Sequence, residues 1–414
     1  MLKIEGGSGK IRTSLHLPGS KSISNRFLLL REVLKARTEV TNLSSAGDTR
    51  ILEQSLALIA STDSATIDIG QAGTDMRFLT AYLAATPGTW TLTGTERMKE
   101  RPVGELVNAL RGLGADITCL EKEGFPPLQI RGKKLSGGEV SIAAGISSQF
   151  ISALLLIAPL LDGPLVVNLK GNVVSRPYIT MTTGLLQQFG FNCATAEKRI
   201  EVSAKKRKKA VPQFVVESDW SAASYFCALC ALAPDMSVEL RQFSKKSLQA
   251  DSVVAELFST VGIVSTFRSD SVLLQKVPQL KKEVEFDFVN CPDLAQTFAV
   301  TCFGLGVGAR LTGLQTLRLK ETDRIEALHK ELVKLGAVVE SGEDFILINP
   351  HNGINTELNP VIETYDDHRM AMSFAALTPC FRTLMVQDHN VVAKSYPAFW
   401  DDLQSLGFSV NLQP

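Results

Sequence analysis

The sequence lacks several features that would assign it to a class of proteins at once. Acidic and basic residues balance at 43 each, so no positive excess indicates a nucleic-acid or other polyanion binder. No run of 18 apolar, uncharged residues occurs, and the first residues hold no apolar signal segment. We therefore expect a cytoplasmic protein that neither spans a membrane nor is secreted.

The seven cysteines show no paired spacing of a disulfide framework. Cys227 and Cys230 form a single CxxC inside a hydrophobic run, without a second pair. Core packing explains them better than metal or redox chemistry. The basic run 205–209 lies between strand-like segments without interleaved aromatics, which favours a solvated hairpin turn over a nucleic-acid patch.

A unit of strand, small polar turn and nearly uncharged helix occurs six times, at intervals of about 70 residues after a shorter first unit. Because these helices are apolar on nearly all sides, we expect them to be buried. They are predicted at residues 27–34, 78–85, 150–161, 222–233, 294–305 and 370–377.

A second series of helices is amphipathic and ends in glycine, the usual left-handed cap, with β-rich segments following. These glycines are Gly114, Gly190, Gly262, Gly336 and Gly407. Six α/β units in 414 residues suit two domains of three units, since a single core stops growing near about 250 to 300 residues. If the buried helices of each domain point the same way, two facing domains enclose an anion-attracting cleft.

The segment 318–324 places three cations and two carboxylates within seven residues at a helix start. Asp323 and Glu326 read as a capping box, with Lys320 and Glu321 in the turn before the helix and Arg324 in its first turn. Cations at a helix N-terminus suit a phosphate, and Glu321 among them could give or accept a proton. A solvated helix start with mixed charges is the alternative.

Other helix starts carry polar groups that capping alone does not require. The loop at 17–26 lacks the spacing of a nucleotide-binding phosphate loop, but Lys21 and Arg26 still favour an anion site. Asp293 is either a general base or a plain cap. At 365–369 we expect Arg369 to clamp an anion, oriented by its acidic neighbours, since further metal ligands are missing at suitable spacing.

Eight stretches in order, LPGSKSISNR, AGTDMR, RMKERP, SSQF, SRPYI, DWSAASYF, LKETDR and YDDHRMAM, resemble the 5-enolpyruvylshikimate-3-phosphate synthase family of enolpyruvyl transferases over nearly the whole chain. The resemblance implies an α/β fold of two domains, each of three βαβαββ repeats (an inside-out α/β barrel), with the active site in the cleft between them. It places residues 1–20 plus 217–414 in one domain and 21–216 in the other.

In this family the 5-hydroxyl of shikimate 3-phosphate attacks C2 of phosphoenolpyruvate while C3 is protonated, and the adduct then loses phosphate. The resemblance makes Asp293, assisted by Lys21, the proton acceptor and Glu321 the donor. It assigns shikimate 3-phosphate to Lys21, Ser22, Arg26, Ser147, Ser148, Gln149, Ser175, Tyr178, Asp293 and Lys320. It assigns phosphoenolpyruvate to Lys21, Gly73, Arg101, Gln149, Arg324, Arg369 and Lys394.

The resemblance further implies a monomer of the shikimate pathway to chorismate and aromatic amino acids, a target of glyphosate, with no metal, organic cofactor, nucleic acid or membrane. Four residues depart from the family pattern: Gln71, Asp75, Phe78 and Thr316. A carboxylate at 75 would repel phosphoenolpyruvate unless it is paired, and Arg77 is an expected partner. We therefore expect an altered phosphoenolpyruvate affinity and an altered response to glyphosate.

Two other readings remain open. The UDP-N-acetylglucosamine enolpyruvyl transferases share the fold, but they rely on a reactive loop cysteine, and Cys119 lies in a β-like run. A non-catalytic anion-binding protein on the same scaffold would bind the ligands without turning them over, and Asp75 is the one feature that favours it.

Overall fold

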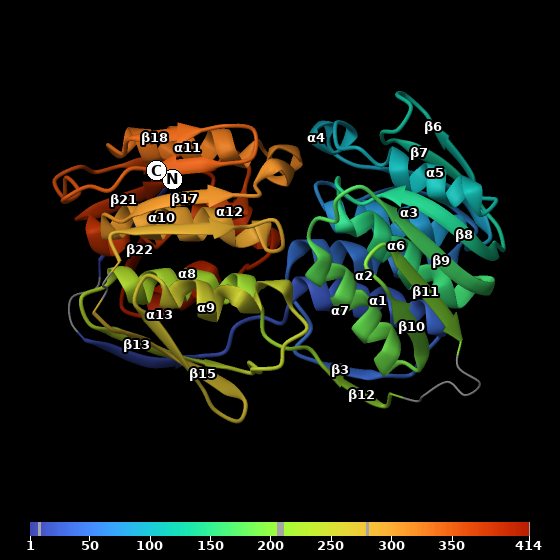
Figure 1. Ribbon diagram of the computed structural model, residues 1–414, viewed down its shortest axis with the longest axis horizontal. Helices are drawn as coiled ribbons and strands as arrows, with labels where there is room; N and C mark the ends of the chain where they lie inside the picture. The colour runs from blue at the N-terminus through green and yellow to red at the C-terminus, as the bar shows by residue number, and fades with distance from the viewer. Residues whose placement is uncertain (7–9, 205–210, 279–280, 414) are drawn as a thin grey trace. The chain divides into compact units, whose positions relative to one another are not determined.

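The computed structural model describes residues 1–6, 10–204, 211–278 and 281–413. The chain forms two compact units, Met1–Ser20 with Glu217–Pro414 (unit 1) and Lys21–Val216 (unit 2). Each is an assembly of repeats in which a strand, a buried helix, a strand, a second helical segment and two strands follow one another (Figure 1). Within the described residues, no helix combines the length and the apolar character needed to cross a membrane.

Unit 1 contains three such repeats. The first comprises β2 (Ile11–Leu15), α8 (Trp220–Leu232), β13 (Met236–Arg241), η2 (Ala250–Val253), α9 (Val254–Ser259), β14 (Ile263–Phe267) and β15 (Ser271–Lys276). The second comprises β16 (Glu283–Asp287), η3 (Pro292–Leu294), α10 (Ala295–Leu305), β17 (Gly308–Thr312), η4 (Gln315–Leu319), α11 (Arg324–Lys334), β18 (Val339–Ser341) and β19 (Ile346–Ile348). The third comprises β20 (Val361–Ile362), α12 (His368–Ala375), η5 (Thr378–Cys380), β21 (Thr383–Val386), η6 (His389–Lys394), α13 (Phe399–Ser405), β22 (Ser409–Leu412) and β1 (Leu2–Glu5).

Unit 2 contains two full repeats and a reduced one. The full repeats are β4 (Ser64–Asp68), α3 (Gly73–Ala84), β5 (Gly88–Thr93), α4 (Glu96–Lys99), α5 (Gly104–Gly112), β6 (Asp116–Cys119) and β7 (Leu128–Gly132), then β8 (Ser136–Ala143), α6 (Ser148–Ile157), η1 (Ala158–Leu160), β9 (Asp162–Lys170), α7 (Arg176–Gln188), β10 (Phe191–Thr195) and β11 (Arg199–Ala204). The reduced repeat is α1 (Lys21–Leu34), β3 (Glu39–Thr41), α2 (Gly47–Ser61) and β12 (Gln213–Val215). It has a two-stranded sheet, β12-β3, in agreement with the short first period of the sequence.

The five four-stranded sheets share one strand order. In the sheet β16-β17-β19-β18, β16 and β17 run parallel, starting at the pair Glu283 and Gly308, and the other two contacts are antiparallel. The same pattern holds in the sheets β4-β5-β7-β6, β8-β9-β11-β10, β2-β13-β15-β14 and β20-β21-β1-β22. This recurrence makes the repeats structural equivalents. Among the described strands the sheets remain separate, and we observe no closure of a barrel.

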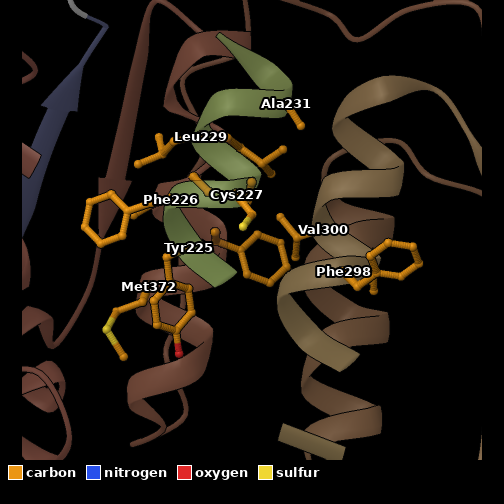
Figure 2. Packing of buried hydrophobic residues seen from close by; sticks show 14 of the residues in the cluster. Tyr225, Phe226, Cys227, Leu229, Ala231, Phe298, Val300 and Met372 are labelled. Carbon is orange, nitrogen blue, oxygen red and sulfur yellow. The ribbon is translucent and has the colours of Figure 1, made fainter. Parts of the chain in front are cut away.

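The core of unit 1 is built around three helices, α8, α10 and α12, that pack against one another. Their side chains are apolar on nearly every face, and Tyr225 and Phe226 of α8 lie with Phe298 of α10 and Met372 of α12 in one buried cluster (Figure 2). In unit 2, α1, α3 and α6 pack together in the same way. The prediction of buried helices is therefore confirmed.

The observed helices differ from the predicted ranges mainly at their ends. Five of them begin two to six residues before the predicted range, because the polar turn already belongs to the helix or caps it. The helix predicted at 150–161 ends at Ile157 and continues as a 3-10 turn, since Pro159 lacks the N–H needed to extend it. The five predicted glycine stops all have positive φ, between 87° and 95°, as a left-handed cap requires.

The predicted turn at 205–209 lies outside the described residues. The strands on either side of it, β11 and β12, belong to different sheets, so they do not form a hairpin with each other. The cysteine prediction is confirmed where the structure can test it. Cys227 and Cys230 are free, fully buried thiols of α8.

Candidate active site

The guanidinium of Arg324, the first residue of α11, is the centre of a buried charge cluster in unit 1. Its Nε lies 2.5 Å from Oδ2 of Asp367, its Nη1 lies 3.0 Å from Oδ1 of Asp293, and its Nη2 lies 2.9 Å from Oε2 of Glu321. Burial disfavours the cation, but these three carboxylates hold the pKa of Arg324 above its ordinary value. A rigid fork of N–H donors suits this arrangement better than an ammonium would.

The sequence explains why Arg324 reaches all three carboxylates. Asp323 caps α11 by accepting a hydrogen bond from the backbone N–H of Glu326 at 3.1 Å, which confirms the N-cap half of the predicted capping box, while the Glu326 carboxylate pairs with Lys330. The turn holding Lys320 and Glu321 immediately precedes the helix, also as predicted. The cap therefore fixes the direction in which the first helical side chain leaves the backbone.

Asp293 lies in η3 and faces three cations. Nη2 of Arg369 is 2.9 Å from its Oδ2, and Nη1 of Arg324 and Nζ of Lys320 are 3.0 and 3.5 Å from its Oδ1. Burial raises the pKa of Asp293, but Arg369, Lys320 and Arg324 together outweigh burial and lower the pKa well below 3.8. Asp293 is thus an ionised carboxylate, and it lies within η3 rather than at its cap.

Glu321 is held between two cations. Besides Arg324, Nζ of Lys394 lies 3.7 Å from its Oε1, and only 8 % of the Glu321 side chain is exposed. Lys394, at the end of η6, thereby joins residues that are about 70 positions away along the chain. All six predicted site residues of unit 1 meet in this one cluster: Asp293, Lys320, Glu321, Arg324, Arg369 and Lys394.

The N-terminus of α12 corrects one detail of the prediction for residues 365–369. Asp367 accepts from the backbone N–H of Arg369 at 2.7 Å and so caps the helix, while its carboxylate pairs with the side chain of Arg324. The carboxylate that contacts the guanidinium of Arg369 is Asp293 from another repeat. The Asp367 carboxylate therefore joins the cluster through its ion pair with Arg324, and it contacts Arg369 at the backbone N–H.

In unit 2, Lys21 begins α1 and pairs with a residue that the sequence did not single out. Its Nζ lies 2.8 Å from Oδ2 of Asp48, in the first turn of α2, and both side chains are largely buried. The sequence could not reveal this contact because Asp48 belongs to no charged motif and lies at the start of an ordinary amphipathic helix. The ion pair holds the ammonium of Lys21 in one place.

Arg26 is a buried cation with neutral surroundings. Its Nε donates to Oγ1 of Thr182 at 2.8 Å, and its two Nη atoms donate to the backbone oxygen of Ser22 and to Oγ of Ser152. Burial lowers the pKa of Arg26 to about 10. Within the described residues no carboxylate forms an ion pair with it, which is costly unless a ligand supplies the negative charge.

Two aromatic rings flank the same guanidinium. Cζ of Arg26 lies 5.4 Å from the ring centroid of Phe78 and 5.9 Å from that of Tyr178. Such rings stabilise a desolvated cation through their quadrupole. Phe78, a residue that departs from the family pattern, therefore supports a predicted substrate-binding arginine.

Gly73 and Arg101, which the resemblance assigns to the same substrate, lie side by side. Gly73 is the first residue of α3, and a Cβ on it would lie only 2.5 Å from Nη2 of Arg101. The missing side chain is thus what allows the guanidinium to lie over the helix N-terminus. Arg101 itself is buried and directly precedes Pro102.

The remaining predicted residues of unit 2 supply neutral hydrogen-bonding groups. Ser147 caps α6 by accepting from the backbone N–H of Gln149 at 3.2 Å, and Ser148 is the buried first residue of the helix. The amide of Gln149 donates to Oγ1 of Thr74, at 3.2 Å, which ties α6 to α3. Ser175 caps α7 with φ of 53°, and its carbonyl accepts from the backbone N–H of Tyr178.

Asp75 is tied to the interior of unit 2. Its Oδ1 accepts from Nδ2 of Asn25 at 2.8 Å, and Oδ1 of Asn25 accepts from Oγ1 of Thr49 at 2.7 Å. Arg77, its expected partner, donates to the backbone oxygens of Gly73 and Pro102. The structure thus adds Asn25, which the sequence did not single out, as a partner of the Asp75 carboxylate.

Cys119 is the last residue of β6, and its sulfur accepts a hydrogen bond from the backbone N–H of Gly124 at 3.3 Å. The prediction that it lies in a strand rather than on a loop is confirmed. Among the described residues, no group of three or more His, Cys, Asp or Glu is placed to hold a metal ion.

Comparison with known proteins identifies the family of this chain. The family model described as EPSP synthase (3-phosphoshikimate 1-carboxyvinyltransferase) matches residues 52–403. This chain belongs to the EPSP synthase family. A family member from Bacteroides fragilis, named 3-phosphoshikimate 1-carboxyvinyltransferase, is 45 % identical over 404 residues, which are 97 % of each chain. A member of the same name from Shewanella denitrificans is 37 % identical over 95 % of this chain and 96 % of its own.

Solved structures give the same fold. An EPSP synthase from Acinetobacter baumannii superimposes with a TM-score of 0.78 at 22 % sequence identity, covering 99 % of this chain and all of the other. The family resemblance and the α/β repeat architecture inferred from the sequence are therefore confirmed. The roles of individual residues remain predictions.

Proposed function

We propose that this chain is a 3-phosphoshikimate 1-carboxyvinyltransferase, which transfers the enolpyruvyl group of phosphoenolpyruvate to the 5-hydroxyl of shikimate 3-phosphate and releases phosphate. The observation that carries the residue assignment is the cluster around Arg324, where two carboxylates suited to proton transfer lie among four cations. Membership of the EPSP synthase family supports the reaction itself.

In the addition step, the 5-hydroxyl oxygen forms a bond to C2 of phosphoenolpyruvate, and its proton passes to Asp293 with the help of Lys21. Glu321 gives a proton to C3, so that the double bond becomes a single bond in a tetrahedral adduct. In the second step Glu321 takes a proton back from C3, the double bond forms again, the C2–O bond to phosphate breaks, and the proton held by Asp293 passes to the leaving phosphate. No metal or organic cofactor is part of this proposal.

The ion pairs of unit 1 suggest how binding prepares the proton transfers. Arg324, Arg369 and Lys394 now neutralise Asp293 and Glu321. A carboxylate or phosphate of the substrate that engages these cations weakens their hold on both carboxylates. Asp293 then becomes a better proton acceptor, and Glu321 takes up the proton that it must donate.

The groups of unit 2 suit the shikimate 3-phosphate side of the reaction. We assign Lys21, Ser22, Arg26, Ser147, Ser148, Gln149, Ser175 and Tyr178 to this substrate, together with Asp293 and Lys320. The uncompensated charge of buried Arg26 and the neighbouring hydroxyls match a phosphorylated polyol. Gly73, Arg101, Arg324, Arg369 and Lys394, with Lys21 and Gln149, are assigned to phosphoenolpyruvate.

The family resemblance is the ground for three further proposals. We place residues 1–20 with 217–414 in one functional domain and 21–216 in the other, we expect the chain to act as a monomer, and we expect it to work in the cytoplasm. Sedimentation of the purified protein at working concentration tests the second, and fractionation of the native cells tests the third.

The reaction is tested by release of inorganic phosphate from the two substrates, comparing the wild type with Glu321→Gln. We expect turnover by the wild type and a loss of kcat of about 100-fold or more in the variant, because the proton donor is gone. Glu326→Gln is the matched control, since Glu326 lies in the next turn and pairs with Lys330 at the surface. Binding of both substrates without phosphate release by the wild type would instead support the non-catalytic anion-binding protein.

A further inference from the structure

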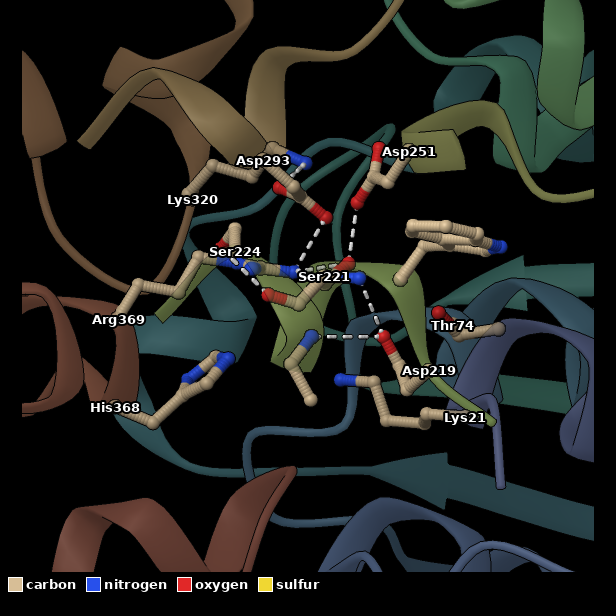
Figure 3. Close-up of polar contacts among 12 residues, drawn as sticks. Lys21, Thr74, Asp219, Ser221, Ser224, Asp251, Asp293, Lys320, His368 and Arg369 are labelled. Carbon is tan, nitrogen blue, oxygen red and sulfur yellow. Dashed lines mark hydrogen bonds and ion pairs between the residues drawn. The ribbon is translucent and has the colours of Figure 1, made fainter. Parts of the chain in front are cut away.

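Near Asp293, unit 1 contains a buried carboxylate, Asp251, that the proposed reaction does not use. Asp251 lies in η2 with only 2 % of its surface exposed. The hydroxyl of Ser221, in the first turn of α8, donates a hydrogen bond to its Oδ2 (Figure 3). A polar pair in this position needs an explanation, because burying a carboxylate is costly.

The fold does not require this pair for helix capping. Asp219 caps α8 on its own, since its Oδ1 accepts from the backbone N–H groups of Ser221 at 2.8 Å and Ala222 at 3.2 Å. The hydroxyl of Ser221 is therefore not needed to cap the helix. It points away from the cap, toward Asp251 and Arg369 (Figure 3).

Ser221 joins Asp251 to the cation that clamps Asp293. Nη2 of Arg369 lies 3.5 Å from Oγ of Ser221 and 2.9 Å from Oδ2 of Asp293. Because the hydroxyl proton is directed to Asp251, the lone pairs of Ser221 are free to accept from Arg369. The contact is long in the ligand-free protein, and such contacts commonly shorten when a substrate binds.

We propose that Asp251 and Ser221 are positioning residues that fix the guanidinium of Arg369 for phosphoenolpyruvate. The inference rests on the proposed function, in which Arg369 binds that substrate. Tyr225 completes the support from the same helix, with its hydroxyl 3.4 Å from Nη1 of Arg369. Arg369 is thus held by Asp293 on one side and by the Ser221–Asp251 pair on another, so its fork keeps one orientation when the substrate approaches.

The charges around Asp251 give this support a pH dependence. Burial and the neighbouring Asp293 and Asp219 carboxylates raise the pKa of Asp251, Arg369 and the Ser221 hydroxyl lower it, and the net result is a pKa of about 6. The thiol of Cys291 also faces this carboxylate, and burial raises the pKa of that thiol above its ordinary value. Asp251 is therefore ionised at neutral pH. Its electrostatic attraction for Arg369 weakens as the carboxylate is protonated, when the pH falls through 6.

The test is steady-state kinetics of Ser221→Ala and Asp251→Asn. Each variant should raise the KM for phosphoenolpyruvate about tenfold and leave the KM for shikimate 3-phosphate within about twofold, as expected for the loss of one charge-linked hydrogen bond. Ser221→Thr, which keeps the hydroxyl, should restore the wild-type value. In the wild type, the KM for phosphoenolpyruvate should rise below pH 6, and Asp251→Asn should abolish this rise.

Ser224→Ala is the matched control, because Ser224 lies one turn further along α8 and its hydroxyl donates to the backbone oxygen of Ser221. It should lower the melting temperature without changing either KM. A double-mutant cycle separates positioning from stability: in an Arg369→Lys background, Ser221→Ala should add about twofold or less to the KM for phosphoenolpyruvate.

Three outcomes would overturn the inference. They are an unchanged KM for phosphoenolpyruvate in both variants, an equal rise of both KM values, and full additivity with Arg369→Lys. Failure of the proposed function is distinguishable from these, because the wild type itself would then release no phosphate.

Discussion

Nη1 of Arg324 lies 3.0 Å from Oδ1 of Asp293, although the two residues belong to different elements of one repeat, α11 and η3. The same guanidinium bonds Asp367 of the next repeat, so one arginine connects the polar ends of two buried helices. Removing one member of a buried ion network leaves the others as uncompensated charges, which is strongly destabilising. The arginine is therefore both a structural and a chemical centre of unit 1.

Replacing Arg324 with lysine tests this double role. Lysine keeps the positive charge but cannot bond three carboxylates in the directions of a planar fork. We expect kcat/KM to fall about 100-fold and the free energy of unfolding to fall by about 3 kcal/mol, since a buried network is broken. Phosphate release and chemical denaturation measure the two effects.

Arg324→Lys should also change the dependence of activity on pH. Arg324 is one of the cations that keep the pKa of Asp293 low against the opposing effect of burial. A weaker cation contact favours the protonated acid, so the pKa of Asp293 rises, and activity on the acid side is lost at a higher pH than in the wild type. Arg310→Lys is the control, because Arg310 is exposed and pairs with Glu285. If the acidic side of the activity–pH profile of Arg324→Lys matches that of the wild type, the role given to Asp293 is contradicted.

Gly73→Ala tests how close Arg101 lies to the start of α3. The new Cβ would lie 2.5 Å from Nη2 and 2.8 Å from Cζ of Arg101, so the guanidinium has to move. We expect the KM for phosphoenolpyruvate to rise about tenfold, while the melting temperature holds or rises because alanine favours the helix more than glycine.

Gly112→Ala is the matched control for this substitution. Its Cβ in α5 would meet only Cγ1 of Val140, at an ordinary 3.9 Å. It should stabilise the protein by up to about 1 kcal/mol and leave both KM values unchanged. Equal kinetic behaviour of the two alanine variants would show that the Gly73–Arg101 contact does not matter for binding.

The periodicity of the sequence was sufficient to predict the buried helices and the glycine caps, because both follow from local chemistry. The sixfold repeat predicted the number of α/β units. The seven residues 318–324 were enough to predict that a helix begins next to Asp323. Asp48, Asn25 and Asp251 could not be found in this way. Asp48 and Asp251 belong to no charged motif, and Asn25 is a neutral residue within the stretch 17–26. Each acquires its role only when another helix brings Lys21, Asp75 or Ser221 to it.

The prediction for 365–369 shows a second limit. Sequence proximity suggested that Asp367 orients the side chain of Arg369, but the structure pairs Asp367 with Arg324. Adjacent residues at a helix start point in different directions, so charges that lie next to each other in the sequence need not meet in space.

Asp75→Asn separates charge from hydrogen bonding at a residue that departs from the family pattern. The new amide oxygen can still accept from Asn25, so the free energy of unfolding should change little. Removing the negative charge near Gly73 should lower the KM for phosphoenolpyruvate about threefold, and glyphosate, which competes with that substrate in the family, should inhibit more strongly. Inhibition constants and the KM measure this, with the exposed Asp63→Asn as control. An unchanged KM would mean that the interior of unit 2 already screens the carboxylate.

Phe78→Leu tests whether the departure at residue 78 supports Arg26. The ring of Phe78 is fully buried, 5.4 Å from Cζ of Arg26, while the other partners of that guanidinium are hydroxyls, a carbonyl oxygen and the ring of Tyr178. Leucine fills much of the space but lacks the π-face, so the cation becomes harder to bury. A desolvated cation–π contact is worth about 2 kcal/mol, and the melting temperature should fall accordingly.

The same substitution should raise the KM for shikimate 3-phosphate about tenfold, because the arginine assigned to this substrate loses its fixed position, while kcat changes less than about threefold. Phe125→Leu is the control. Lys122 lies 4.2 Å from the Phe125 ring, but this cation is exposed, so removing the ring should alter neither stability nor KM appreciably. If Phe78→Leu lowers stability as expected yet leaves the KM for shikimate 3-phosphate unchanged, the ring supports only the fold, and Arg26 is not held for that substrate.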